Sequence, residues 1–333
     1  MSTGKNYGTE FAREIVDEEK DFCRRGFLRN ATAAWMARGS LPGFLAMAAN
    51  NVVAAKGGRT EDKRRLSVRV GLQKAGWGDT PLTDFFAAAR DLGYEGVELA
   101  PPWLEKEGHR MDDVDRLLVK SGTALAPAVF VGGHELRDSS ARKAYLAKAR
   151  KHARWIVSHG GKYLIYSTVG HSSETERRQV FAAYDAVADA VLGEGCVPLY
   201  HNHFKESYPL SRQFLEEDLD ELDWSRWKLC VDTGHLVLAL TDPVKFMEQW
   251  ADKVCWMHCK DVRSSDVKTL SQVRWSENFT ILGTGVVDFP AILKRLASAG
   301  YDSWLVVEQD NTPDPIATSR RSIKYLKNIL NQM

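Results

Sequence analysis

Four apolar segments in the second half of the chain end in residues that can bind a metal ion. Residues 197–203 and 254–260 end in stretches that contain histidine, residues 228–232 end in an aspartate, and residues 304–309 contain a glutamate near their end. A polar side chain at the end of a buried strand loses its hydration and needs a compensating partner. Nitrogen and oxygen ligands from several strands suit one shared divalent ion. The pattern therefore predicts a metal site.

Strand periodicity indicates which side chains can share that site, because alternate side chains of a barrel strand point into the interior. His201 and His203 lie on one face of their strand, and His258 lies on the same face as Lys260. The carboxylate candidates are Asp232 and Glu308. One aspartate, one glutamate and two histidines would bind a single ion, with Mn2+ or Co2+ favoured over Mg2+, Fe2+ or Zn2+.

Each candidate also has a purely structural interpretation. A histidine at a strand end is often a hydrogen-bonded core residue, Asp232 can cap the helix that follows it, and Glu308 can pair with Lys260. These interpretations account for the residues one at a time. The repetition of the pattern at the same depth on four neighbouring strands favours a shared metal site instead.

Alternating strands and helices would bring these strand ends together. Short apolar runs predict strands, and longer amphipathic stretches predict the helices between them. Eight such pairs over about 270 residues are typical of an α/β protein with the (β/α)8 TIM barrel fold, whose active sites lie at the C-terminal ends of the strands. A doubly wound sheet is the alternative, but residues 72–78 do not match its glycine-rich turn. The predicted strands are residues 66–73, 96–100, 124–130, 163–167, 197–203, 228–232, 254–260 and 304–309, and the predicted helices are residues 82–92, 111–120, 141–158, 174–192, 211–222, 243–250, 290–299 and 317–331.

Length and composition are those of an ordinary globular protein. The 333 residues carry a formal net charge of +1, which gives no indication of a nucleic-acid-binding surface. The five cysteines are not spaced as a CxxC motif or as a dense secreted scaffold, so we expect no disulfide framework. We expect residues 1–58 to form an export signal and linker, and residues 59–333 to form a single catalytic barrel.

The N-terminal segment has the features of an export signal. Arg24 and Arg25 precede a weakly apolar, alanine-rich stretch, residues 31–55, which Arg38 interrupts. The segment resembles a twin-arginine signal and is too broken to span a membrane stably. The alternative is an N-terminal extension with an incidental arginine pair. We expect export of the folded protein by the twin-arginine route, with the periplasm as its destination.

Four motifs in the last third of the chain carry a family resemblance. They are residues 231–236, 258–263, 283–290 and 306–310. With these motifs the chain resembles the xylose isomerase-like TIM barrel superfamily, which includes the sugar phosphate isomerases and epimerases. Within that superfamily it is most similar to the inosose dehydratase branch. The resemblance covers residues 66–330, and its first strands are generic.

The resemblance implies which residues bind the metal. By position, the metal ligands of the superfamily fall on His201, Asp232, His258 and Glu308. Many epimerases of the superfamily have a glutamate at the first of these positions, and a histidine fits the dehydratase branch. Glu98 matches an acidic residue of the second strand that lies in the substrate pocket of relatives.

The reaction expected from the resemblance is a dehydration, or β-elimination, of a keto-polyol or keto-sugar such as an inosose or a 3-keto-glycoside. A divalent ion that holds the carbonyl oxygen would stabilise the enolate formed when the neighbouring proton is removed. Glu308 or Glu98 is the expected proton acceptor. His203, His235 or Lys260 is expected to protonate the departing hydroxyl or to stabilise the enolate.

Three other classes of function use the same fold. An isomerase or epimerase would return the proton to the enolate instead of losing water, and it is the main alternative. Nucleic-acid repair, suggested by the relationship to endonuclease IV, would need a trinuclear site and a basic face. A non-catalytic sugar-binding barrel would have no need of intact ligands. The expected partner is a small carbohydrate or cyclitol, without nucleic acid or stable membrane insertion, and a homo-oligomer is left open.

Overall fold

The computed structural model describes residues 66–333 except 131–138, 168–173, 204–211, 264–274 and 311. The predicted export signal and the predicted domain boundary at residue 58 lie outside the described residues. In the described part of the chain, eight parallel strands close into a barrel in the order β1, β10, β7, β6, β5, β4, β3 and β2. Their bounds are Arg69–Gln73 (β1), Gly96–Leu99 (β2), Leu125–Phe130 (β3), Tyr163–Ser167 (β4), Val197–His201 (β5), Lys228–Asp232 (β6), Val254–Cys259 (β7) and Trp304–Val307 (β10).

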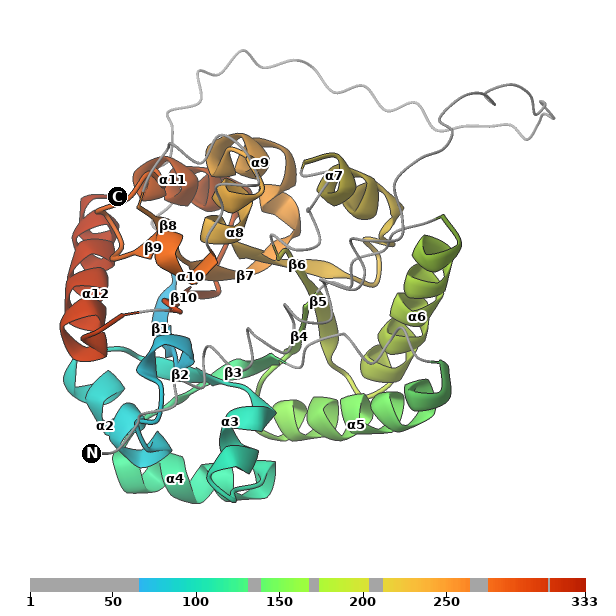
Figure 1. The fold of residues 1–333 in the computed structure, drawn as a ribbon, viewed down its shortest axis with the longest axis horizontal. Coiled ribbons are helices and arrows are strands. Elements are labelled where there is room, and N and C mark those ends of the chain that lie inside the picture. The colour runs from blue at the N-terminus through green and yellow to red at the C-terminus, as the bar shows by residue number, and fades with distance from the viewer. Residues whose placement is uncertain (1–65, 131–138, 168–173, 204–211, 264–274, 311) are drawn as a thin grey trace, which may run out of the picture. The chain divides into compact units, whose positions relative to one another are not determined.

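Helices surround the barrel and cover the outer faces of its strands (Figure 1). None of the helices formed by the described residues is long and apolar enough to cross a membrane. The helices are Leu82–Asp91 (α2), Pro101–Lys106 (α3), Val114–Ser121 (α4), Ser139–Ser158 (α5), Glu174–Leu192 (α6), Arg212–Glu221 (α7), Thr233–Leu238 (α8), Pro243–Trp250 (α9), Trp275–Asn278 (α10), Phe289–Ala299 (α11) and Pro315–Gln332 (α12).

The predicted (β/α)8 TIM barrel is confirmed. Each predicted strand matches a barrel strand, and the main difference is that several strands end one or two residues earlier than predicted. Short elements in the loops after the strands were not predicted: α3, α8, α10 and the small antiparallel pair of β8 (Asp261–Val262) and β9 (Phe279–Thr280). Their lengths give too little periodicity for a prediction from sequence.

A layer of apolar side chains fills the barrel interior directly below the strand ends. Trp256 and Trp304 are its largest members, with their ring centroids 6.1 Å apart. Gly96 makes room for them, because a Cβ there would lie 2.8 Å from the Trp304 ring. The complete layer is Ala126, Ile165, Leu199, Cys230, Trp256, Trp304 and Val306.

The register of the strands sets the height of the next layer of inward-facing residues. His258 on β7 is paired with Asp232 on β6 and with Val306 on β10. Since alternate residues of a strand share a face, a residue two positions beyond each interior residue also faces inward. This relation holds for His201 after Leu199. The barrel therefore presents one layer of polar side chains above one layer of apolar ones.

Candidate metal centre

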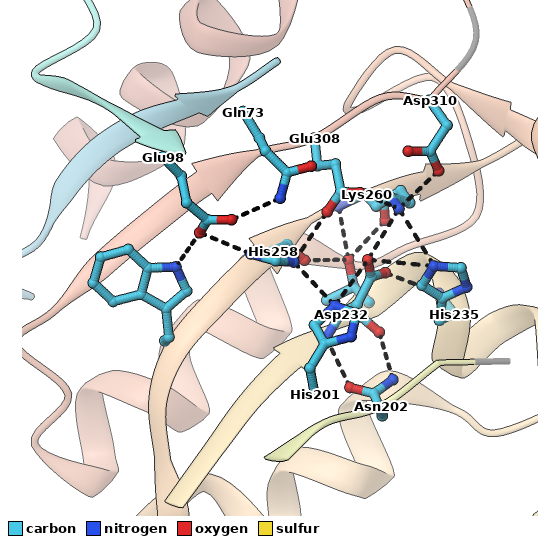
Figure 2. A network of polar contacts seen from close by, with 12 residues as sticks. Gln73, Glu98, His201, Asn202, Asp232, His235, His258, Lys260, Glu308 and Asp310 are labelled. Atoms are coloured by element: carbon cyan, nitrogen blue, oxygen red, sulfur yellow. Dashed lines mark hydrogen bonds and ion pairs between the residues drawn. The ribbon is translucent and has the colours of Figure 1, made fainter. Parts of the chain in front are cut away.

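The four predicted ligands meet at the C-terminal end of the barrel. His201 and Asp232 are the last residues of β5 and β6, His258 lies one residue before the end of β7, and Glu308 directly follows β10. All four are buried, with Asp232 and His258 fully inaccessible. Their ligand atoms lie within 4.8 Å of one another, and Figure 2 shows the side chains converging on a common point.

Short distances between the ring nitrogens and carboxylate oxygens of these four residues define the centre of the cluster. His201 Nε2 lies 3.0 Å from His258 Nδ1, and the same His258 Nδ1 lies 3.0 Å from Glu308 Oε2. His201 Nε2 is also 3.9 Å from Asp232 Oδ2. Two imidazole nitrogens and two carboxylate oxygens thus face one another with no apolar group between them. This is the donor set that borderline divalent metals prefer.

The carboxylate oxygens that face the centre fit a bound cation. Asp232 Oδ2 and Glu308 Oε2 are buried, and within the described residues neither accepts a well-formed hydrogen bond, although Lys260 Nζ lies 3.1 Å from the first and His258 Nδ1 3.0 Å from the second. A buried carboxylate oxygen without a hydrogen bond is costly unless a cation offsets its charge. Asp232 Oδ1, in contrast, accepts the backbone N–H of His235 at 2.9 Å and caps α8. Asp232 therefore caps α8 with one oxygen and turns the other toward the centre of the cluster.

Lys260 supplies a fixed positive charge beside the centre. Its Nζ lies 2.8 Å from Glu308 Oε1, 2.9 Å from Asp310 Oδ2 and 3.1 Å from Asp232 Oδ2. Burial opposes its charge, but these carboxylates raise the pKa of Lys260 well above the ordinary value. Its Nζ also lies 4.6 Å from the ring centroid of Phe279. Lys260 is therefore an ammonium ion held among three carboxylates.

The histidines differ in charge because their surroundings differ. Burial lowers the pKa of His201 and of His235 well below the ordinary value, so both are neutral near pH 7. Burial also opposes charge on His258, but the Cys230 thiol and the Glu98 and Glu308 carboxylates raise its pKa well above the ordinary value. Only a neutral imidazole has a lone pair to offer a metal, so metal binding by His258 would require release of a proton from its ring.

The remaining predicted residues lie around the centre at different distances. The His203 ring packs against the His235 ring at a tilt of 34°, with centroids 3.9 Å apart, and His235 Nε2 lies 3.8 Å from Asp232 Oδ2. Glu98 is fully buried, and its Oε2 lies 2.9 Å from His258 Nε2. Glu98 thus contacts a predicted ligand from the side that faces away from the other ligands (Figure 2).

Four residues of the site were not assigned a role from the sequence. Asn202 binds the backbone of Asp232 twice, through Nδ2 at 3.0 Å and Oδ1 at 2.8 Å. Asp310 lies two residues beyond Glu308, so strand periodicity offered a signal for it. Gln73 ends β1, and Trp256 lies two residues before His258 with an indole N–H that needs an acceptor.

The glycine-rich motif at residues 283–285 has a structural role next to the site. The carboxylate of Asp261 accepts the backbone N–H groups of Gly283 and Gly285 at 3.0 and 2.9 Å, and that of Val287 at 3.1 Å. A Cβ at Gly285 would lie 2.2 Å from Asp261 Oδ1. The motif therefore fixes this loop against the chain that follows β7.

Comparison with known proteins places the chain in a family. The family model described as xylose isomerase-like TIM barrel matches residues 86–329. The chain belongs to this family. Active sites of TIM-barrel enzymes lie at the C-terminal ends of the strands, which is where the four-residue cluster lies.

The chain is also similar to individual proteins of known name. The chain is 23% identical over 302 residues to inosose dehydratase from Lacticaseibacillus casei (strain BL23), covering 80% of this chain and 98% of that protein. It is 25% identical over 283 residues to the rhizopine catabolism protein MocC of Rhizobium meliloti, covering 75% and 83%. The solved structure of 3-keto-D-glucoside 4-epimerase from E. coli has the same fold, with a TM-score of 0.57, 16% identity, and coverage of 79% and 100%. These relatives support a sugar-modifying enzyme.

Proposed function

We propose that the protein is a divalent-metal-dependent lyase that eliminates water, or another β-leaving group, from a keto-polyol or keto-sugar such as an inosose or a 3-keto-glycoside. The observation that carries the proposal is the buried cluster of His201, Asp232, His258 and Glu308. The similarity of the chain to inosose dehydratase supports this choice of reaction. Small keto-cyclitols and keto-sugars are the substrate class that we propose.

The chemistry requires a group that stabilises negative charge on the substrate carbonyl. When bound, a divalent ion supplies positive charge beside that oxygen and makes the neighbouring C–H bond easier to break. The four ligands fit such an ion because they offer two imidazole nitrogens and two carboxylates. Mn2+ and Co2+ are the ions we favour.

The residues of the chain would move the protons. Glu308 is ionised, because Lys260 and His258 lower its pKa well below the ordinary value although burial alone would raise it. Its carboxylate accepts the proton from the carbon next to the carbonyl. The C–O bond at the next carbon breaks, and the departing hydroxide takes a proton from the Lys260 ammonium and leaves as water. Lys260 is the proposed donor because His235 is neutral.

Epimerisation by the same site is the alternative. It would return a proton to the opposite face of the enolate, and a base on each face is the simplest arrangement for that reaction. Of the four ligands, only Asp232 and Glu308 are carboxylates, and Asp232 is fully inaccessible. His201 occupies the position where many relatives that act as epimerases have a glutamate. This difference favours elimination.

Turnover of a substrate panel tests the proposal. Metal-loaded protein incubated with keto-inositols and 3-keto-glycosides should release a conjugated carbonyl product that absorbs in the ultraviolet. Protein stripped with a chelator should produce none until Mn2+ or Co2+ is restored. Formation of a stereoisomer without any ultraviolet-absorbing product would favour the epimerase alternative.

We also propose that the folded enzyme is exported by the twin-arginine route to the periplasm. The support is Arg24 and Arg25 ahead of the alanine-rich stretch. Replacing both arginines with lysine should retain the protein in the cytoplasm, because the signal depends on the arginine pair. Cell fractionation and immunoblotting measure the result, with Arg13→Lys as the control. Unchanged periplasmic recovery of the double variant would refute the export proposal.

A further inference from the structure

The two ring nitrogens of His258 face different partners. Nδ1 faces the centre of the cluster, 3.0 Å from both His201 Nε2 and Glu308 Oε2. Nε2 faces away from the centre, 2.9 Å from Glu98 Oε2. Figure 2 shows Glu98 on one side of His258 and Asp232 and His201 on the other. The ring thus links the candidate metal centre to a carboxylate outside it.

Glu98 acts as a hydrogen-bond acceptor at this contact. Its Oε2 also lies 2.7 Å from the indole Nε1 of Trp256, which can only donate, and its Oε1 accepts the amide N–H of Gln73 at 2.7 Å. Because both oxygens of Glu98 already accept hydrogen bonds, we assign the imidazole nitrogen that faces Oε2 as a further donor. His258 therefore has its proton on Nε2, and in the neutral ring the lone pair of Nδ1 points to the other ligands.

The contact crosses the barrel interior. Glu98 comes from β2 and His258 from β7, and β1 and β10 lie between these strands in the closed sheet. Glu98 is fully inaccessible, and Gln73 is 5% exposed. The donors from Gln73 and Trp256 hold Glu98 against the ring of His258. Glu98 thus contacts the candidate ligand His258 from outside the cluster, whereas Glu308 belongs to the cluster itself.

We propose that Glu98 is a positioning residue of the metal centre, which fixes the orientation and the tautomer of His258 so that Nδ1 faces the metal. This inference rests on the proposed metal site and replaces the expectation that Glu98 accepts a proton from the substrate. Carboxylates that accept the second N–H of a metal-binding histidine raise metal affinity by about 10- to 100-fold. Glu98→Gln is the informative variant, because it removes the negative charge beside His258 and leaves one side-chain oxygen where two now face three donors.

Cobalt affinity provides a test without any substrate. Titration of the metal-free protein with Co2+ against a competing chelator should give wild type one tight site. Glu98→Gln should bind Co2+ about 10- to 100-fold more weakly, with an altered visible spectrum because His258 is no longer held in place. Glu105→Gln, an exposed glutamate on α3, is the matched control and should bind as wild type does.

Turnover at saturating Co2+ separates positioning from proton transfer. If Glu98 positions His258, excess Co2+ should restore most of the lost turnover of Glu98→Gln. Wild-type cobalt affinity in this variant would overturn the inference, and so would turnover that stays abolished at every Co2+ concentration. Absence of a tight site in wild type would instead refute the metal centre itself.

A second variant keeps the inference testable if Glu98→Gln does not fold. Gln73→Met removes a donor to Glu98 and touches none of the four ligands in the described contacts. We expect a severalfold loss of Co2+ affinity with unchanged thermal unfolding. Unchanged Co2+ affinity in a folded Gln73→Met protein would count against the inference even if Glu98→Gln does not fold.

Discussion

Glu308→Gln should lower turnover of a keto-inositol or 3-keto-glycoside by about 10^3- to 10^4-fold, the upper range for loss of a proton-transfer group. The amide cannot accept the proton from the substrate carbon. It also gives Lys260 Nζ, now 2.8 Å from Glu308 Oε1, a neutral partner in place of a charged one. Initial rates at saturating metal provide the measurement.

Metal content should separate the two roles of Glu308. The other three ligands and an amide oxygen should retain part of the metal, so the loss of turnover should exceed the loss of metal. Glu248→Gln is the matched control, because Glu248 forms an exposed ion pair with Arg295 outside the site and should leave the rate unchanged. Near-normal turnover in Glu308→Gln would remove Glu308 from the mechanism.

His258→Ala should abolish stoichiometric metal binding and turnover. The variant removes the ring nitrogen that lies 3.0 Å from both His201 Nε2 and Glu308 Oε2. Three carboxylates then remain around Lys260, and Glu98 remains beside the empty ring position. Elemental analysis after dialysis against a weak chelator should find about one divalent ion per wild-type chain and far less in the variant. Circular dichroism would verify that the variant is folded.

A control histidine is available outside the site. His159 follows α5 and pairs with Asp115, with 21% of its side chain exposed. His159→Ala should retain the metal content of wild type. Equal metal content in His258→Ala and wild type would exclude His258 as a ligand and would require a different centre.

Strand periodicity was sufficient to bring the four candidate ligands together. Each candidate is two residues beyond a member of the apolar interior layer, as with His258 after Trp256. Alternation along a strand is a local property, so the sequence contains it directly. The same rule would have found Asp310, two residues after Glu308.

Contacts between distant strands could not be predicted in the same way. The partners of Glu98 come from β1 and β7, and their approach depends on barrel closure and on the register between strands. A residue on β2 therefore looked equally suited to the substrate pocket and to the interior. The charge of Lys260 likewise depends on three carboxylates from distant parts of the chain. Asp232 ends β6, and Glu308 and Asp310 follow β10.

The fate of the hydrogen next to the carbonyl tests the central claim most directly. Metal-loaded protein should turn over a substrate of the panel in heavy water, and mass spectrometry and NMR should follow that hydrogen into product or solvent. Proton abstraction by Glu308 predicts that this hydrogen is released to solvent or replaced by deuterium, and that a conjugated carbonyl product accumulates. Complete retention of the hydrogen in the product would contradict the account, because it would indicate a hydride shift in place of proton abstraction by Glu308.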